Sequence, residues 1–217
     1  MGIGDDGGEI NYWPAFLDLV TSSLMLFLLL TFLQSSFSAA SLEALTTEAR
    51  QERFLRLFRA EFKPEVDAGT IAVHRTVDFL QLTFSDRVLF ESGEFRLLPA
   101  GRLALARCAQ VFVRTGTTYE LIQVEGHTDQ QALNRREYPA DNWELSTARA
   151  LSVVQFLADR RGLAPELFSA NGYGSYRPVA SNRTGSGRAR NRRIEIRLFF
   201  AGTRRAEGGS LAPAVQR

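Results

Sequence analysis

The sequence YELIQVEGHTD at residues 119–129 decides the fold of the C-terminal half of the chain. Apolar and polar side chains alternate in its first part, which predicts a β-strand that ends near the Gly-His-Thr-Asp turn. The sequence NWELSTARA at residues 142–150 opens a stretch with apolar residues every three to four positions, which predicts a helix over residues 142–161. A strand followed by a helix can bring Asp129 and Arg149 together although they lie 20 positions apart.

Further strands and helices alternate on both sides of this stretch. The pattern predicts an α+β fold, in which residues 70–200 form a two-layer α/β sandwich. The expected strands cover residues 80–84, at the end of a strand-like region that starts at residue 70, and residues 119–126, 168–174 and 192–200. A helix is expected over residues 99–114, and a polar loop is expected between residue 174 and Asn191. Residues 201–217 are rich in Gly, Ala and Arg without any period, so we expect a disordered tail there.

The N-terminal part of the chain is apolar enough to cross a membrane. The 24 residues from Leu19 to Leu42 carry no charge and include the run LMLFLLLTFL at residues 24–33. A bilayer core needs about 20 helical residues, so residues 14–34 are predicted to form a transmembrane helix with Pro14 in its first turn. A signal peptide cleaved near residues 38–40 and a soluble core helix are the two alternatives.

Asp18 is the informative residue of this helix. An acid within a membrane span is costly unless it faces protein or water, so it is a functional candidate. Thr21 and Ser22 follow at i+3 and i+4 and share its helix face. These three residues are predicted to conduct ions; the alternative is an interfacial Asp18 solvated by headgroups and water.

Residues 35–69 are expected to form a helical connector. Apolar residues recur through it between charged ones and end at Phe62, just before Pro64. The apolar stripe can dock on a partner, self-associate, or pack as a surface helix on the domain; the sequence leaves these three options open. Its members are Leu42, Leu45, Ala49, Leu55, Phe58 and Phe62.

Charge and composition exclude several functions. Residues 1–49 carry six acids and no Lys or Arg, whereas the rest of the chain carries 18 acids and 26 basic residues. No basic cluster lies beside aromatic stacking residues, so nucleic acid is not an expected partner. Two His and one Cys argue against a metal cluster, and we expect no cofactor and no enzymatic activity. Cys108 lies in a helical pattern and is read as a small buried hydrophobe.

Four ordered motifs resemble the OmpA-like peptidoglycan-binding domain. They are VEGHTD (124–129), NWELSTARA (142–150), GYGSYRP (172–178) and GRARNRRIEI (187–196), and the similarity covers about residues 80–200. The NWELS form resembles the MotB branch in particular. The N-terminal helix with Asp18 is similar to the MotB transmembrane helix, where the equivalent Asp carries protons.

The resemblance implies a ligand and a set of binding residues. The ligand is the peptide stem of peptidoglycan, whose diaminopimelate carries ammonium and carboxylate groups. Asp129 matches the family acid that accepts the ammonium, and Arg149 matches the family arginine that grips a carboxylate. Thr128 is expected beside them, and Asn191, Arg192 and Arg193 are expected to border the pocket. The alternative for each is a structural ion pair or, around Asn191, a loop held by internal hydrogen bonds.

The resemblance also implies a cellular role. The chain would be the wall-anchored subunit of a proton-driven motor in the bacterial inner membrane, with residues 1–13 in the cytoplasm and the C-terminal domain in the periplasm. Two copies would sit inside a ring, expected to be a pentamer, of a MotA-like multi-span subunit. The acidic start and helical connector differ from flagellar members and favour a non-flagellar motor such as the Zorya anti-phage system. The alternative is a passive tether between membrane and wall, without ion flow.

Overall fold

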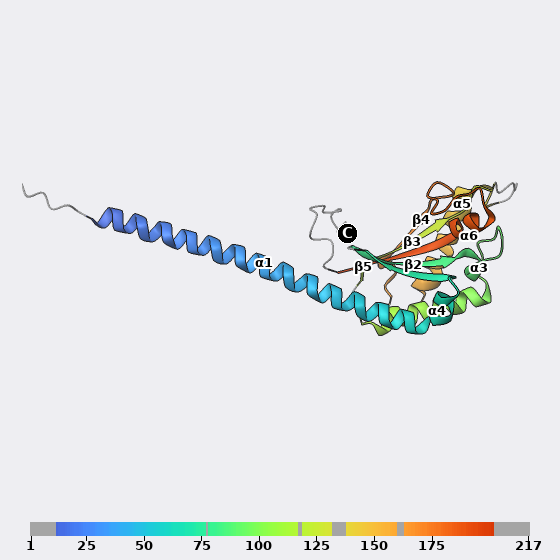
Figure 1. The fold of residues 1–217 in the computed structure, drawn as a ribbon, viewed down its shortest axis with the longest axis horizontal. Coiled ribbons are helices and arrows are strands. Elements are labelled where there is room, and N and C mark those ends of the chain that lie inside the picture. Colours follow the sequence, from blue (N-terminus) through green and yellow to red (C-terminus); the bar gives the residue numbers. More distant parts are fainter. Residues whose placement is uncertain (1–11, 77, 117–118, 132–137, 160–162, 202–217) are drawn as a thin grey trace, which may run out of the picture. The chain divides into compact units, whose positions relative to one another are not determined.

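The computed structural model describes residues 12–201 apart from 77, 117–118, 132–137 and 160–162, and for residues 37–45 it describes the backbone alone. The chain divides into two compact units, residues 1–45 and 46–217 (Figure 1). Most of the expected cytoplasmic N-terminus and nearly all of the expected tail lie outside the described residues.

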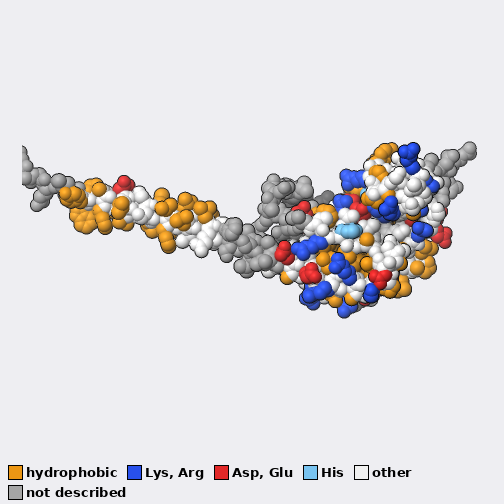
Figure 2. Space-filling model, viewed as in Figure 1, with side chains coloured by type: hydrophobic (Ala, Val, Ile, Leu, Met, Phe, Trp, Pro, Cys, Tyr) orange, Lys and Arg blue, Asp and Glu red, His pale blue; other side chains and the backbone are white. Residues whose placement is uncertain are grey.

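The first unit contains the N-terminal part of helix α1 (Trp13–Glu61). Within the described residues, one segment is long and apolar enough to cross a membrane, Trp13–Ser36, with a mean hydropathy of 2.1. Its large apolar side chains are exposed in the isolated chain, and Figure 2 shows them covering this part of the helix. The segment includes the predicted span of residues 14–34.

The second unit is built on a five-stranded sheet of order β1-β2-β5-β3-β4. All neighbours are antiparallel except β3 and β4, which are parallel. The strands are β1 (Ile71–Arg75), β2 (Phe79–Ser85), β3 (Tyr119–His127), β4 (Phe168–Gly172) and β5 (Arg193–Phe200). The strand-like region expected from residue 70 is therefore an antiparallel pair, in which Ile71 lies opposite Phe84.

Helices complete the second layer of this unit. The longer ones are α4 (Pro99–Arg114) and α5 (Asn142–Ala158), which pack on each other. Helix α5 also packs against β3 and β4. The shorter ones are α2 (Lys63–Asp67), α3 (Asp86–Leu89), the 3-10 turn η1 (Pro165–Leu167) and α6 (Gly185–Asn191). The expected α+β fold with a two-layer sandwich is confirmed.

Helix α6 is one of the short elements that the sequence did not predict. The polar loop predicted before Asn191 contains α6, a short helix whose first turn is capped by the Thr184 hydroxyl, which accepts a hydrogen bond from the Gly187 amide at 3.0 Å. A threonine cap satisfies one free amide of a helix start. This cap allows a helix to begin in the sequence Gly-Ser-Gly, which by composition favours a loop.

The end of α1 belongs to the core of the second unit. Phe54, Phe58 and Phe62 are fully buried. The Phe58 ring stacks on Phe54 at 5.7 Å and on Phe62 at 4.6 Å between centroids. Of the three options for the apolar stripe, its C-terminal part therefore takes the third, packing on the domain. The same core includes Cys108, whose buried position matches the expectation.

Candidate functional site

The end of β3 and the first turns of α5 meet at the predicted site. Their backbones approach so closely that a side chain at Gly126 would meet the Ser146 carbonyl oxygen at 2.0 Å from its Cβ. Gly172 on β4 is crowded in the same way by Thr147. Only glycine allows this approach, which brings Thr128 and Asp129, just after β3, next to α5 and its Arg149.

Four charged side chains form a continuous chain of ion pairs there. Asp129 Oδ2 lies 2.5 Å from Arg192 Nη1, and Arg192 Nε lies 3.2 Å from Asp86 Oδ2. Asp86 Oδ2 in turn lies 3.5 Å from Arg149 Nη1. Asp129 also accepts a hydrogen bond from the Gln131 amide at 3.0 Å. We call Asp86, Asp129, Arg149 and Arg192 the acid–arginine cluster.

Arg149 is the most enclosed member of this cluster, with 2% of the residue exposed. Its Nε donates to the Glu94 carbonyl at 2.8 Å and its Nη2 to the Glu91 carbonyl at 3.3 Å. Burial lowers the pKa of the Arg149 guanidinium, and the Asp86 carboxylate only partly offsets this. Arg149 therefore fastens the segment of residues 91–94 to α5.

Asp86 is a cluster member that the sequence reasoning missed. It is 4% exposed and begins α3 directly after β2. Burial raises the pKa of its carboxyl, although Arg149 and Arg192 pull in the opposite direction. Desolvation thus outweighs pairing for both Asp86 and Arg149, as is common for buried ion pairs.

Two buried oxygen atoms at the site have no hydrogen-bond partner among the described residues. They are Thr128 Oγ1 and Asp86 Oδ1. Buried polar atoms are nearly always paired in folded proteins, so such exceptions concentrate where a ligand or water completes the site. A site with one free hydroxyl and one free carboxylate oxygen can accept or donate further hydrogen bonds.

Asn191 and Arg193 are occupied by contacts within the protein. The Asn191 side chain accepts hydrogen bonds from the amides of Val179 and Ala180 and donates to the Ala180 carbonyl and to Asn182. Arg193 is buried and pairs with Glu195 at 2.6 Å. Both residues are next to Arg192 in the sequence, but their side chains hold the loop and the strand around the site. For Asn191 this agrees with the alternative of a loop held by internal hydrogen bonds.

Arg192 is the accessible guanidinium of the cluster, with 28% of its side chain exposed. It also lines a cleft of about 710 Å³ between the β1–β2 pair and α6. Arg87, Arg190 and Arg193 line the same cleft, which makes it basic. A ligand that approaches this side of the domain meets Arg192 before it meets Arg149.

The predicted ion-conducting residues lie on one face of α1. The Thr21 hydroxyl donates to the Leu17 and Asp18 carbonyls at 2.8 and 3.0 Å, which leaves its oxygen able to accept. Asp18 and Ser22 are exposed in the isolated chain. The nearest basic residue along the chain is Arg50, so the span itself offers Asp18 no partner of opposite charge.

Comparison with known proteins places this domain in a family. Residues 89–192 match the model of the OmpA family. Motility protein B of Bacillus subtilis is 34% identical over 127 residues, which are 58% of this chain and 48% of that protein. The chain spans about half to three fifths of the first curated relatives that it matches.

Two solved structures share the fold. The cell wall anchor of the type VI secretion system (T6SS) from Pseudomonas aeruginosa is 32% identical with a TM-score of 0.60, and the match covers 65% of this chain and 96% of that structure. A putative MotB-like protein from Desulfovibrio vulgaris is 28% identical with a TM-score of 0.64, covering 73% and 99%. The chain therefore belongs to the OmpA family, with a C-terminal domain of the MotB-like kind.

Proposed function

We propose that the C-terminal domain binds the peptide stem of peptidoglycan at the acid–arginine cluster. The observation that carries this proposal is the Asp129–Arg192 pair, a carboxylate and an accessible guanidinium at 2.5 Å. A zwitterionic amino acid presents the complementary charges, since its ammonium suits Asp129 and its carboxylate suits a planar guanidinium. Membership of a family whose solved members include a cell wall anchor supports the same ligand.

The geometry also supports a separate role in ligand binding for each of the four residues. The ligand exchanges the internal Asp129–Arg192 pair for two pairs of its own, so that the ammonium takes Asp129 and the carboxylate takes Arg192. Arg149 lies behind them, where it holds Asp86 and residues 91–94 in place. The family resemblance implies a direct contact of Arg149 with the ligand, which would compete with the hydrogen bonds that Arg149 donates to the Glu91 and Glu94 carbonyls. Thr128 Oγ1 supplies a further hydrogen bond to the ligand.

Replacement of Asp129 by Asn tests the ammonium site. Asn keeps the shape but removes the charge, and a hydrogen bond to a charged group is worth about 1.5–3 kcal/mol, so affinity should fall by roughly 10- to 150-fold. Co-sedimentation of the full chain in detergent with purified cell-wall sacculi measures this, with free diaminopimelate as competitor. Asp159→Asn, at the exposed end of α5, should bind like the wild type. Equal binding by both variants would refute the site.

We further propose that the chain is the wall-anchored subunit of an ion-driven motor in the inner membrane. In this proposal two copies cross the membrane through residues 13–36, inside a ring, taken to be pentameric, of a MotA-like multi-span partner. Asp18 then takes up and releases an ion, with Thr21 and Ser22 on the same face. The similarity to Motility protein B and an acid in an apolar span support it. A flagellar motor and a Zorya-type defence motor both fit, and the acidic N-terminus favours the second.

Replacement of Asp18 by Asn separates a motor from a passive tether. Asn preserves the side-chain shape but cannot titrate, so proton flux through the co-expressed chain and partner, followed with a pH-sensitive fluorophore, should drop to background. Binding to sacculi should be unchanged. Undiminished flux in Asp18→Asn would refute ion conduction at Asp18, and a wild type without flux above background would leave only the tether.

A matched threonine pair refines this test. Thr21 and Thr31 both donate to carbonyls three and four positions earlier, Thr31 at 2.9 and 3.0 Å. Thr21→Val should reduce flux and Thr31→Val should not, since only Thr21 shares a face with Asp18 at close range.

A further inference from the structure

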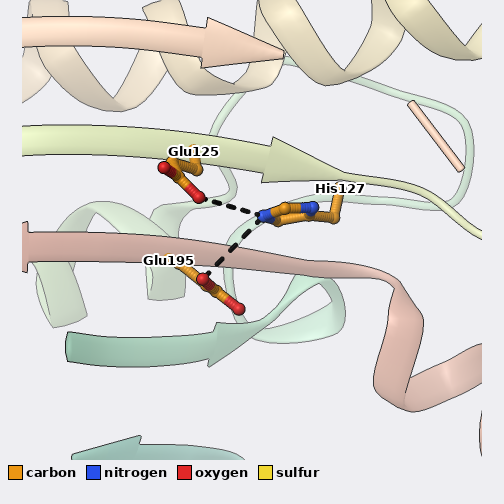
Figure 3. Close-up of side chains that lie close together, drawn as sticks. All are labelled: Glu125, His127 and Glu195. Atoms are coloured by element: carbon orange, nitrogen blue, oxygen red, sulfur yellow. Dashed lines mark ion pairs between the residues drawn. The ribbon is translucent and has the colours of Figure 1, made fainter. Parts of the chain in front are cut away.

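A second polar cluster lies on the sheet, apart from the acid–arginine cluster. Glu125 and His127 stand two positions apart on β3, and Glu195 lies directly opposite Glu125 in the β3–β5 register. The three side chains point to the same side of the sheet and toward one another (Figure 3). All three are at most 3% exposed. The topology thus brings two carboxylates and an imidazole together. The small number of His and Cys residues in the sequence did not predict this cluster.

The distances in this cluster do not fit direct hydrogen bonds. His127 Nε2 lies 3.6 Å from Glu125 Oε2 and 4.0 Å from Glu195 Oε2. Hydrogen bonds between nitrogen and oxygen span about 2.7–3.2 Å. Both imidazole nitrogens of His127 are buried without a hydrogen-bond partner among the described residues. A buried imidazole with two unpaired nitrogens calls for something between it and the carboxylates.

The spacing suits a metal ion. A candidate ligand atom from each of the three side chains lies within 4.8 Å of the others. Around an ion with bonds of about 2.0–2.2 Å, neighbouring ligand atoms in a tetrahedral site are about 3.4 Å apart. The distances of 3.6 and 4.0 Å from His127 Nε2 to the two carboxylates lie close to that spacing. One imidazole and two carboxylates with a position left over is a donor set that Zn²⁺ and similar ions accept.

We propose that Glu125, His127 and Glu195 bind a divalent transition-metal ion of the zinc type. The ligand atoms are His127 Nε2 and one oxygen of each glutamate, and water fills the remaining position. The ion would link the neighbouring strands β3 and β5. Its ligand His127 lies two positions before Asp129. Its binding does not depend on the proposed function, because none of its ligands belongs to the acid–arginine cluster.

Two arginine side chains next to the carboxylates limit the affinity of the site for a cation. Arg197 lies 3.0 Å from Glu125 and 3.1 Å from Glu195, and Arg193 lies 2.6 Å from Glu195. The two guanidiniums balance the charge of the glutamates and compete with the ion.

The basic cleft borders the cluster, because Glu195 and Arg193 line it. The side of α6 is therefore the expected route for an ion toward Glu195. The arginines along the path disfavour a bare cation, which predicts slow binding rather than none.

Cobalt binding tests the site. The full chain is purified in detergent without a histidine tag and stripped of metal with a chelator. It is titrated with Co²⁺, and binding is followed by visible absorption. Its thermal unfolding temperature is measured with and without Zn²⁺. We expect one equivalent of Co²⁺ in a low-symmetry site, and a higher unfolding temperature with Zn²⁺. His127→Gln and Glu125→Gln should weaken binding by about a hundredfold or more, since even outer-shell partners are worth about 10- to 100-fold. His74→Gln is the matched control, because His74 is the other histidine and lies exposed on β1.

A second measurement covers the case in which the His127 variant fails to fold. In the His74→Gln background, His127 is the sole imidazole of the chain, so X-ray absorption of bound cobalt should show one imidazole and oxygen ligands. Absence of Co²⁺ binding by the wild type, absence of an imidazole in that spectrum, or loss of binding in His74→Gln alone would overturn the proposal. A water or a shared proton would then fill the cluster. Sacculus binding through Asp129 is unaffected by any of these outcomes.

Discussion

Arg149→Met is expected to lower the free energy of unfolding by about 3–5 kcal/mol, because it removes one partner of a buried ion pair and leaves the other charged. The stranded group is Asp86, which is 4% exposed and keeps its ion pair with Arg192. The segment of residues 91–94 also loses the two hydrogen bonds that Arg149 donates to its carbonyls. Sacculus binding should disappear together with this stability.

Urea unfolding of residues 46–217, the compact second unit, measures the effect. Arg53→Met, the same change at an exposed position, should stay within about 0.5 kcal/mol of the wild type. The double variant Asp86→Asn/Arg149→Met should lose less than the sum of its two single variants, since no buried charge is stranded. A loss below about 1 kcal/mol in Arg149→Met would contradict the structural role assigned to Arg149.

Arg192→Met is expected to weaken sacculus binding, because it removes the accessible guanidinium of the site. It also takes this partner away from the buried carboxylates of Asp86 and Asp129, so we expect a loss of stability in urea as well.

Phe58→Ala is the second substitution with a large expected effect, about 3–5 kcal/mol of lost stability. Phe58 is fully buried between Phe54 and Phe62, so its removal leaves a cavity that neither neighbour can fill without leaving its own place. Arg59→Ala, the adjacent exposed position on the same helix, is the control and should cost well under 1 kcal/mol.

The same packing predicts where the folded domain begins. A fragment that starts at Lys63 lacks all three phenylalanines. Loss of one such side chain costs about 3–5 kcal/mol, so loss of all three is expected to remove most of the stability of an ordinary domain, about 5–15 kcal/mol. This fragment should be unfolded or aggregated by circular dichroism, whereas residues 46–217 should fold. A stable fragment from Lys63 would contradict the role assigned to the end of α1.

Elements with a clear period were predictable from the sequence alone. The helix expected over residues 99–114 matches α4, and the strand expected from Tyr119 matches β3. Helix α6 was missed because a single threonine cap, invisible to composition, starts it. The sequence did not show what packs on the apolar stripe of α1. A periodic stripe indicates that the face is buried, but it does not identify the surface that buries it.

The candidate site was likewise predictable only in part. Motif order was enough to predict Asp129 next to α5, and that contact region is present in the fold. The roles of Arg192 and Arg193 could not be separated, because adjacent residues at a strand start point to opposite sides and the sequence does not fix the phase. Asp86 lies 43 positions before Asp129, and only the sheet order places it between two arginines.

The buried thiol of Cys108 gives the chain a reporter of its own. Burial raises the pKa of this thiol, so thiolate, the reactive form, is scarce while the core is closed. Alkylation then requires the core to open, and its rate follows the opening equilibrium when reclosing is fast. Because Cys108 is the one cysteine of the sequence, labelling in intact cells would report how often the core of the domain opens there, without any engineered probe.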